Sequence, residues 1–157
     1  MIDKKLITIV VPVFNEQDNI GPFYDRLKKV VASLSDKFDF EFLFTDNCST
    51  DNTFSLLQKI STQDTRIKVL RFTKNFGFQA SILTGYLNAS GDAAVQIDCD
   101  LQDPPELIPK LLKKYEDGYE VVHTKRIKRL GENRIKMLIT KYAYKIINAF
   151  STLELPE

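Results

Sequence analysis

Two carboxylates stand one residue apart at Asp98 and Asp100, directly after the run Ala93–Ile97, which is typical of a strand. The chain leaves the strict alternation of a strand at that point, so both side chains can approach one cation. Mg²⁺ and Mn²⁺ prefer oxygen ligands and commonly bind one or two carboxylates together with substrate phosphates. Gln102, two residues further on, adds an amide oxygen. The pattern favours a metal and phosphate site over the alternative that both aspartates are only turn residues.

Two other carboxylates follow runs that predict strands: Glu16 comes after Leu6–Val11, and Asp46 comes after Phe40–Phe44. As hydrogen-bond acceptors they suit the N–H of a base or the hydroxyls of a ribose. The alternative for Glu16 is a charge that complements the dipole of the following helix. No glycine-rich phosphate loop follows the first strand, which removes most support for a dinucleotide dehydrogenase or a P-loop ATPase. Phosphates must therefore be neutralised by a metal and by basic side chains.

The remaining reactive side chains are few. The single histidine, His123, lies in a strand-like run and is interpreted as structural. Cys48 and Cys99 have no metal-ligand spacing and cannot build a disulfide framework, so they are interpreted as small buried or turn residues.

Strand and helix patterns alternate along the chain, as the positioning of these strand-end residues requires. The predicted strands are Leu6–Val11, Phe40–Phe44, Ile67–Phe72, Ala93–Ile97 and Tyr119–Thr124, and the predicted helices are Asn19–Leu34, Thr53–Ile60, Gly77–Ala89 and Asp103–Asp117, followed by a basic amphipathic helix. In the fourth of these helices Asp103 is expected at the N-cap, with Pro104 first in the helix. The order predicts an α/β fold with an open, mostly parallel sheet and helices on both faces. Such sheets bind ligands beyond the carboxyl ends of their strands, at a switch point in strand order.

Composition limits the class further. The chain has 157 residues, 43% hydrophobic and 27% charged, which indicates one folded domain and excludes wholesale disorder. Its apolar runs are too short for a membrane span, and the N-terminus has no signal-peptide pattern, which predicts a cytosolic domain. Between His123 and Lys145 eight Lys and Arg stand against one acid, which leaves 14 basic and 20 acidic residues elsewhere. This basic end suggests a polyanion or an anionic membrane surface, and a solvated helix face is the alternative.

The chemistry-bearing segments together resemble the inverting glycosyltransferases of family 2, which have the GT-A fold. The resemblance begins at Ile9–Glu16 and continues at Thr45–Thr53, Arg71–Ala80, Gly91-Asp92 and Ile97–Glu106. The form Asp-x-Asp-Leu-Gln-Asp-Pro-Pro-Glu is similar to the polyprenyl-phosphate branch, which includes dolichol-phosphate mannose synthase and bacterial undecaprenyl-phosphate glycosyltransferases. The resemblance covers nearly the whole chain.

The resemblance implies a role for each matching position. The nucleoside would be held by Pro12, Phe14, Glu16 and Asp46. Asp98 and Asp100 match the metal and diphosphate motif, with Cys99 between them in the donor site and Gln102 as a further metal ligand. Arg126 and Arg129 fall in a basic loop that meets phosphate, and Arg126 joins the two aspartates as a catalytic residue.

The resemblance also divides the chain into parts. Residues 1–130 would form the nucleotide-sugar-binding catalytic domain, and residues 131–157 a basic amphipathic helix lying on the membrane, followed by a truncated end. In similar proteins a Gly-Asp-Phe-Arg-Leu-like segment and usually transmembrane helices follow this point, so a C-terminal truncation is expected. Asn47 and Cys48 stand where the family pattern usually has Asp-Gly.

The expected function is a metal-dependent inverting transfer of one sugar from a nucleotide-diphosphate sugar to a polyprenyl phosphate at the cytoplasmic side of the membrane. Mg²⁺ or Mn²⁺ and Arg126 would offset the charge that grows on the leaving nucleoside diphosphate. Two alternatives remain: a saccharide hydroxyl as acceptor, which requires a carboxylate base, and a nucleotide-sugar-binding module without turnover. An anionic membrane surface is an expected partner, nucleic acid is not, and homo-oligomerisation is left open.

Overall fold

The computed structural model of the chain describes residues 4–124. The chain divides into two compact units, Met1–Glu120 and Val121–Glu157, and all the helices and strands described below belong to the first. The strands are β1 (Lys5–Val13), β2 (Phe38–Asp46), β3 (Ile67–Arg71) and β4 (Ala93–Gln96). The helices are α1 (Gln17–Ala32), α2 (Thr53–Gln63), α3 (Phe78–Leu87), the short 3₁₀ helix η1 (Pro105–Leu107) and α4 (Ile108–Glu116). The predicted basic amphipathic helix lies outside the described residues.

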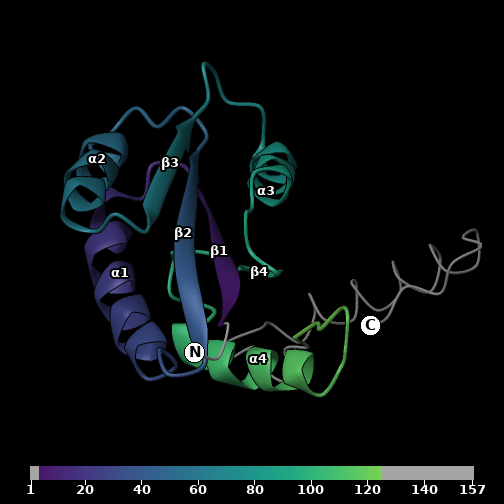
Figure 1. Cartoon of the computed structure of the whole chain (residues 1–157). Coiled ribbons are helices and arrows are strands. Elements are labelled where there is room, and N and C mark those ends of the chain that lie inside the picture. Colours follow the sequence, from purple (N-terminus) through teal and green to yellow (C-terminus); the bar gives the residue numbers. More distant parts are fainter. Residues whose placement is uncertain (1–3, 125–157) are drawn as a thin grey trace, which may run out of the picture. The chain divides into compact units, whose positions relative to one another are not determined.

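The strands form one parallel sheet in the order β3-β2-β1-β4, which confirms the predicted fold class (Figure 1). β1 pairs with β2 from Lys5↔Phe38 to Val13↔Asp46 and with β4 on its other side. Residues 7–13 of β1 are all buried, as expected for a central parallel strand covered on both faces. Because β1 has β2 on one side and β4 on the other, the strand order reverses beside it, and the carboxyl end of β1 is the place where such sheets bind ligands.

Helices cover both faces of this sheet, with α1 and α2 on one face and α3 on the other (Figure 1). The amphipathic helix α1 buries Ile20, Phe23 and Leu27 in a core that also contains Phe42 and Phe44 of β2. On the opposite face Gly85 of α3 lies against Val10, so closely that an added Cβ would be 2.2 Å from Val10 Cγ1. This glycine is therefore what allows α3 to lie directly on β1.

The start of α4 differs from the prediction. Asp103 and Pro104 were expected as the N-cap and first helical residue, but Pro104 is extended (φ −73°, ψ 134°), and the helical turn begins at Pro105. The ring of Pro105 disfavours a helical conformation for the residue before it, which explains the shift. Glu106 forms a 2.6 Å ion pair with Arg26 of α1.

The prediction of a strand at Tyr119–Thr124 is wrong. These residues have no regular secondary structure. Gly118, at φ 93°, ends the turn after α4, and Tyr119 and Val121 are largely exposed. β-branched residues favour a strand, but a strand also needs a neighbouring strand to pair with. A local sequence pattern does not show whether such a neighbour is present. Among the described helices, none has both the length and the apolarity needed to cross a membrane.

Candidate nucleotide-sugar site

A pocket of about 340 Å³ opens at the carboxyl ends of β1 and β4, where the strand order predicts a ligand site. It is lined by Pro12, Val13, Phe14, Glu16, Asn47, Asn75, Gly77, Phe78, Ser81, Asp98, Cys99 and Asp100. Six of these residues were predicted from the sequence as site residues: Pro12, Phe14, Glu16, Asp98, Cys99 and Asp100. The fold therefore brings predicted site residues that follow β1 and predicted site residues that follow β4 into one cavity.

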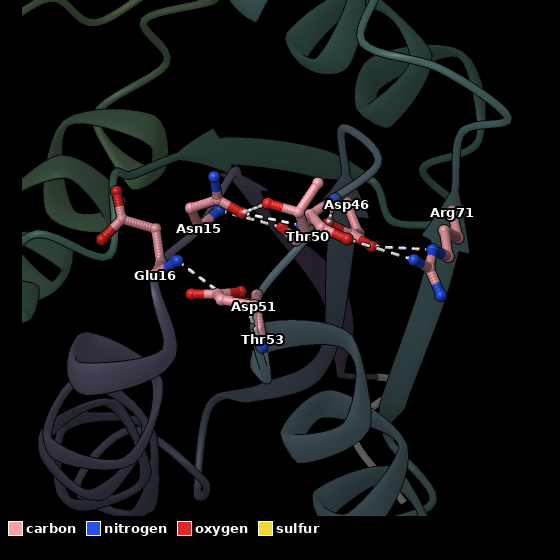
Figure 2. A network of polar contacts seen from close by, with 8 residues as sticks. Asn15, Glu16, Asp46, Thr50, Asp51, Thr53 and Arg71 are labelled. Atoms are coloured by element: carbon pink, nitrogen blue, oxygen red, sulfur yellow. Dashed lines mark hydrogen bonds and ion pairs between the residues drawn. The ribbon is translucent and has the colours of Figure 1, made fainter.

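The loop after β1 is held by the loop after β2 (Figure 2). The backbone N–H of Asn15 donates to Ser49 Oγ at 2.9 Å, and the backbone N–H of Glu16 donates to Thr53 Oγ1 at 2.7 Å. In return, Asn15 Oδ1 accepts the backbone N–H of Thr50 at 2.8 Å. Asn15 has a positive φ of 55°, which turns the chain sharply at the end of the strand. Together these contacts hold Glu16 at the edge of the pocket.

Asp46 lies outside the pocket lining, although the sequence placed it with the nucleoside. It is fully buried at the end of β2, where its Oδ1 accepts the backbone N–H of Ser49 at 2.9 Å. Arg71 Nε approaches Asp46 Oδ2 at 3.3 Å (Figure 2). The guanidinium of Arg71 also lies over the ring of Phe54. Within residues 4–124 Asp46 Oδ2 accepts no hydrogen bond. Asp46 therefore lies next to Asn47 of the pocket wall and anchors the loop that carries it.

The pocket wall includes residues for which the sequence predicted no role. Asn47 donates through Nδ2 to Asn75 Oδ1 at 2.9 Å, and its Oδ1 accepts the backbone N–H of Phe76 at 2.8 Å. Asn75 Oδ1 also accepts the backbone N–H of Gly77 at 2.8 Å, where φ is 91° just before α3. These two amides join the loop after β2 to the start of α3. The available signal was the family-like segment Arg71–Ala80, but it did not show which side chains turn inward.

Asp98 and Asp100 both line the pocket, as predicted from their spacing. Asp98 Oδ1 accepts Gln96 Nε2 at 2.8 Å, and Asp100 Oδ1 accepts the backbone N–H of Gln102 at 2.9 Å. Leu101 has a positive φ of 63°, which bends the chain back toward this carboxylate. The side chain of Gln102 does not contribute to the pocket lining.

The pocket is acidic. Glu16, Asp98 and Asp100 line it, and no Lys or Arg from residues 4–124 does. Burial raises the pKa of the Cys99 thiol, and the carboxylates of Glu16, Asp100 and Asp98 raise it further, so Cys99 stays neutral. No group of three or more His, Cys, Asp and Glu arranged as a metal site occurs in the described part of the chain. Two carboxylates nevertheless fit Mg²⁺ or Mn²⁺ when a diphosphate supplies further oxygen ligands.

The predicted basic contributors cannot be placed in this geometry. Arg126 and Arg129 lie outside the described residues, as does the segment 131–157.

The strand order and the position of the pocket define an open α/β protein, and its structural matches are of the GT-A type. The fold is similar to that of mannosyltransferase PcManGT from Pyrobaculum calidifontis, solved with GDP-Man and Mn²⁺, with a TM-score of 0.60, 21% identity, and coverage of 71% of this chain and 32% of that one. A model of the family described as Glycosyl transferase family 2 matches residues 8–156. The chain therefore belongs to glycosyltransferase family 2.

Curated relatives agree with this assignment. An uncharacterized glycosyltransferase, YkcC of Bacillus subtilis, is 40% identical over 149 residues, which is 95% of this chain and 46% of that protein. A bactoprenol glucosyl transferase of Shigella phage SfV is 37% identical over 151 residues, which is 96% of this chain and 48% of that protein. The chain thus spans about half the length of the curated relatives it matches.

Proposed function

We propose that this chain is the nucleotide-sugar-binding part of a metal-dependent inverting glycosyltransferase that transfers a sugar from a nucleotide-diphosphate donor to a polyprenyl phosphate. The observation that carries the proposal is the charge of the pocket, where Glu16, Asp98 and Asp100 meet without a Lys or Arg from residues 4–124. A diphosphate entering this pocket would be repelled unless a cation accompanied it. The proposal is supported by family membership and by the Mn²⁺ that accompanies GDP-Man in the structurally similar mannosyltransferase.

Each part of the proposed site has a distinct task. Asp98 and Asp100 would hold Mg²⁺ or Mn²⁺, with Gln102 as a further ligand. The metal would neutralise the diphosphate and the charge that develops on it as the sugar leaves. Pro12, Phe14 and Glu16 would hold the nucleoside, Asp46 would support it from beside Asn47, and Arg126 and Arg129 would meet the phosphates.

The proposed acceptor is a polyprenyl phosphate, because several relatives are named bactoprenol glucosyl transferases. A phosphate acceptor is already anionic and can attack the anomeric carbon without a strong base. A saccharide hydroxyl would instead require a carboxylate close to the attacking oxygen. Donor binding without transfer is the second candidate for this chain alone, since it spans about half of its curated relatives.

Calorimetry with UDP and GDP, each with and without Mn²⁺, tests the donor and metal site. Asp100→Ala should lower the Mn²⁺-dependent affinity at least about tenfold, because even the outer-sphere partners of metal ligands are worth 10–100-fold. The fold should persist, because Asp100 lies outside the core. Asp36→Ala, an exposed carboxylate before β2 at the opposite end of the sheet, is the matched control. Unchanged Mn²⁺-dependent binding by Asp100→Ala would exclude the proposed metal site.

Sedimentation with anionic vesicles tests the proposed membrane partner. Each Lys or Arg near an anionic leaflet contributes about 1 kcal/mol, so the eight basic residues of His123–Lys145 should hold the chain on the vesicles at low salt. The double variant Arg129→Glu/Lys136→Glu should bind less, and added salt should weaken both proteins. If the wild-type chain ignores anionic vesicles at low salt, this segment faces protein instead.

A further inference from the structure

Ser81 is the buried polar residue of the pocket whose hydroxyl has no hydrogen bond within the described part of the chain. The residue is 1% exposed, and its Oγ is buried without a partner in residues 4–124. It nevertheless belongs to the pocket lining. A buried hydroxyl without a partner is unfavourable, and such groups in native folds call for an explanation. A ligand group in the pocket would supply that explanation.

The position of Ser81 follows from the packing of α3. Gly85, one turn further along α3, lies on Val10 of β1, which places this face of the helix against the strand. Four helical residues rise about 6 Å and two strand residues rise about 6.6 Å. Ser81 is therefore placed over Pro12, the next residue of β1 on the same face, and both line the pocket. The hydroxyl is thus held in place by backbone packing.

The pocket has two chemically different sides. Glu16, Asp98 and Asp100 make one side acidic and suited to a cation with phosphates. The side formed by the loop after β2 and by α3 is neutral and polar, with Asn47, Asn75 and Ser81 in the lining. Neutral amides and hydroxyls suit the uncharged polar edge of a ligand.

The apolar walls decide which uncharged part of the donor fits. Phe14 and Phe78 line the pocket and are 42% and 50% exposed, and Pro12 and Val13 complete an apolar surface. A planar base stacks on such aromatic faces. We infer that the Ser81 hydroxyl hydrogen-bonds the nucleoside of the donor and is a binding residue of the nucleotide site. This inference rests on the proposed function and deepens it.

Titration of the full 157-residue chain with UDP, GDP and UDP-glucose, with Mn²⁺ and again with EDTA, tests the inference. Ser81→Ala should lower the affinity for both UDP and GDP roughly 3- to 10-fold, by the same factor with and without Mn²⁺, because the contact is with the nucleoside. Its melting temperature without ligand should equal or exceed that of the wild type, because a buried unpaired hydroxyl has been removed. Ser55→Ala makes the same chemical change at an exposed site on α2 and should change neither quantity.

Other results would overturn the inference in distinguishable ways. Unchanged affinity with a lower melting temperature would show that Ser81 Oγ stabilises the helix and does not contact the nucleotide. A loss confined to UDP-glucose would assign the hydroxyl to the sugar. A wild-type chain that binds neither UDP nor GDP would overturn the proposed function itself, and this inference with it.

Discussion

Carboxylates toward the amino end of the sheet accept several hydrogen bonds, whereas the buried carboxylate of Asp46 at the carboxyl end has one oxygen that accepts none from residues 4–124. Asp64, just before β3, accepts Arg66 Nε at 2.9 Å and Arg66 Nη2 at 2.6 Å, and Tyr24 Oη at 2.6 Å. Glu41 on β2 accepts Lys68 Nζ at 2.7 Å and the backbone N–H of Ser90 at 2.6 Å, besides Thr8 Oγ1. These groups join strands and loops that are distant in sequence.

Asp46 lies at the carboxyl end of the same strand as Glu41. Both side chains are buried, but their hydrogen-bond partners differ. Asp46 Oδ2 has the Arg71 ion pair and accepts no hydrogen bond from residues 4–124, and the Ser81 hydroxyl on α3 is also without a hydrogen bond among these residues. In the low-dielectric interior of a protein, a network whose donors and acceptors are all paired is stabilising. A buried polar group without a partner costs folding free energy. The difference indicates that a fully paired network toward one end of the sheet contributes stability, whereas the buried Asp46 and Ser81 are less completely hydrogen-bonded by the described residues.

The largest effect on stability should come from Glu41. Glu41→Ala leaves the hydroxyl of Thr8 and the N–H of Ser90 without their acceptor, so the free energy of unfolding should fall by about 3 kcal/mol. Urea denaturation measures this loss. Glu106→Ala, which breaks the exposed pair with Arg26, is the control and should cost less than about 1 kcal/mol. Equal losses in the two variants would show that the buried network of Glu41 contributes no more than an exposed ion pair.

At Asp46 a substitution should have only a small effect on stability and should also affect nucleotide binding. Asp46→Asn keeps an acceptor for the backbone N–H of Ser49, so the free energy of unfolding should fall by no more than about 1 kcal/mol. Nucleotide binding should weaken by roughly 1 kcal/mol with or without Mn²⁺, because loss of the Arg71 ion pair loosens the loop that carries Asn47 of the pocket wall. Calorimetry with UDP and GDP measures both conditions. An affinity that falls only when Mn²⁺ is present would assign Asp46 to the metal site instead.

A smaller effect is expected in acid, from Asp64. The guanidinium of Arg66, with the hydroxyl of Tyr24, holds the pKa of Asp64 well below its usual range. A carboxylate whose pKa is lower in the folded state stabilises the protein above the unfolded-state value, about 3.9, and that stability is lost as the pH falls further. Asp64→Asn should be less stable at neutral pH but should lose less on acidification from about pH 4 to pH 2. Urea denaturation of the wild type and of Asp64→Asn at both pH values measures how much stability each protein loses on acidification. Equal losses would contradict the assignment.

The main elements were predictable because their signals are local and strong. The unbroken apolar run of β1 indicated a strand covered on both faces, and its residues 7–13 are all buried. Asp98 and Asp100 were predictable as site residues because the carboxyl ends of parallel strands meet at one edge of the sheet.

Other features depend on contacts that no local pattern encodes. Ser81 and Asn75 entered the pocket because Gly85 lets α3 lie on β1 and because two asparagine amides bridge the loops. The strand predicted at Tyr119–Thr124 has no regular structure in spite of its residue types. Asp46 had the expected position at a strand end, yet its partners turn it away from the lining of the pocket.

The left-handed backbone at the loops around the pocket has a consequence for the free energy of binding. Among the described residues, the non-glycine residues with positive φ are Asn15 at 55°, Cys48 at 64° and Leu101 at 63°, which follow β1, β2 and β4 respectively. Such conformations persist only where the surrounding structure enforces them. The loops therefore reach their bent shape when the domain folds, before any nucleotide arrives. A ligand then enters a preorganised cavity. The conformational entropy lost in ordering the walls of the cavity is lost on folding and not on association.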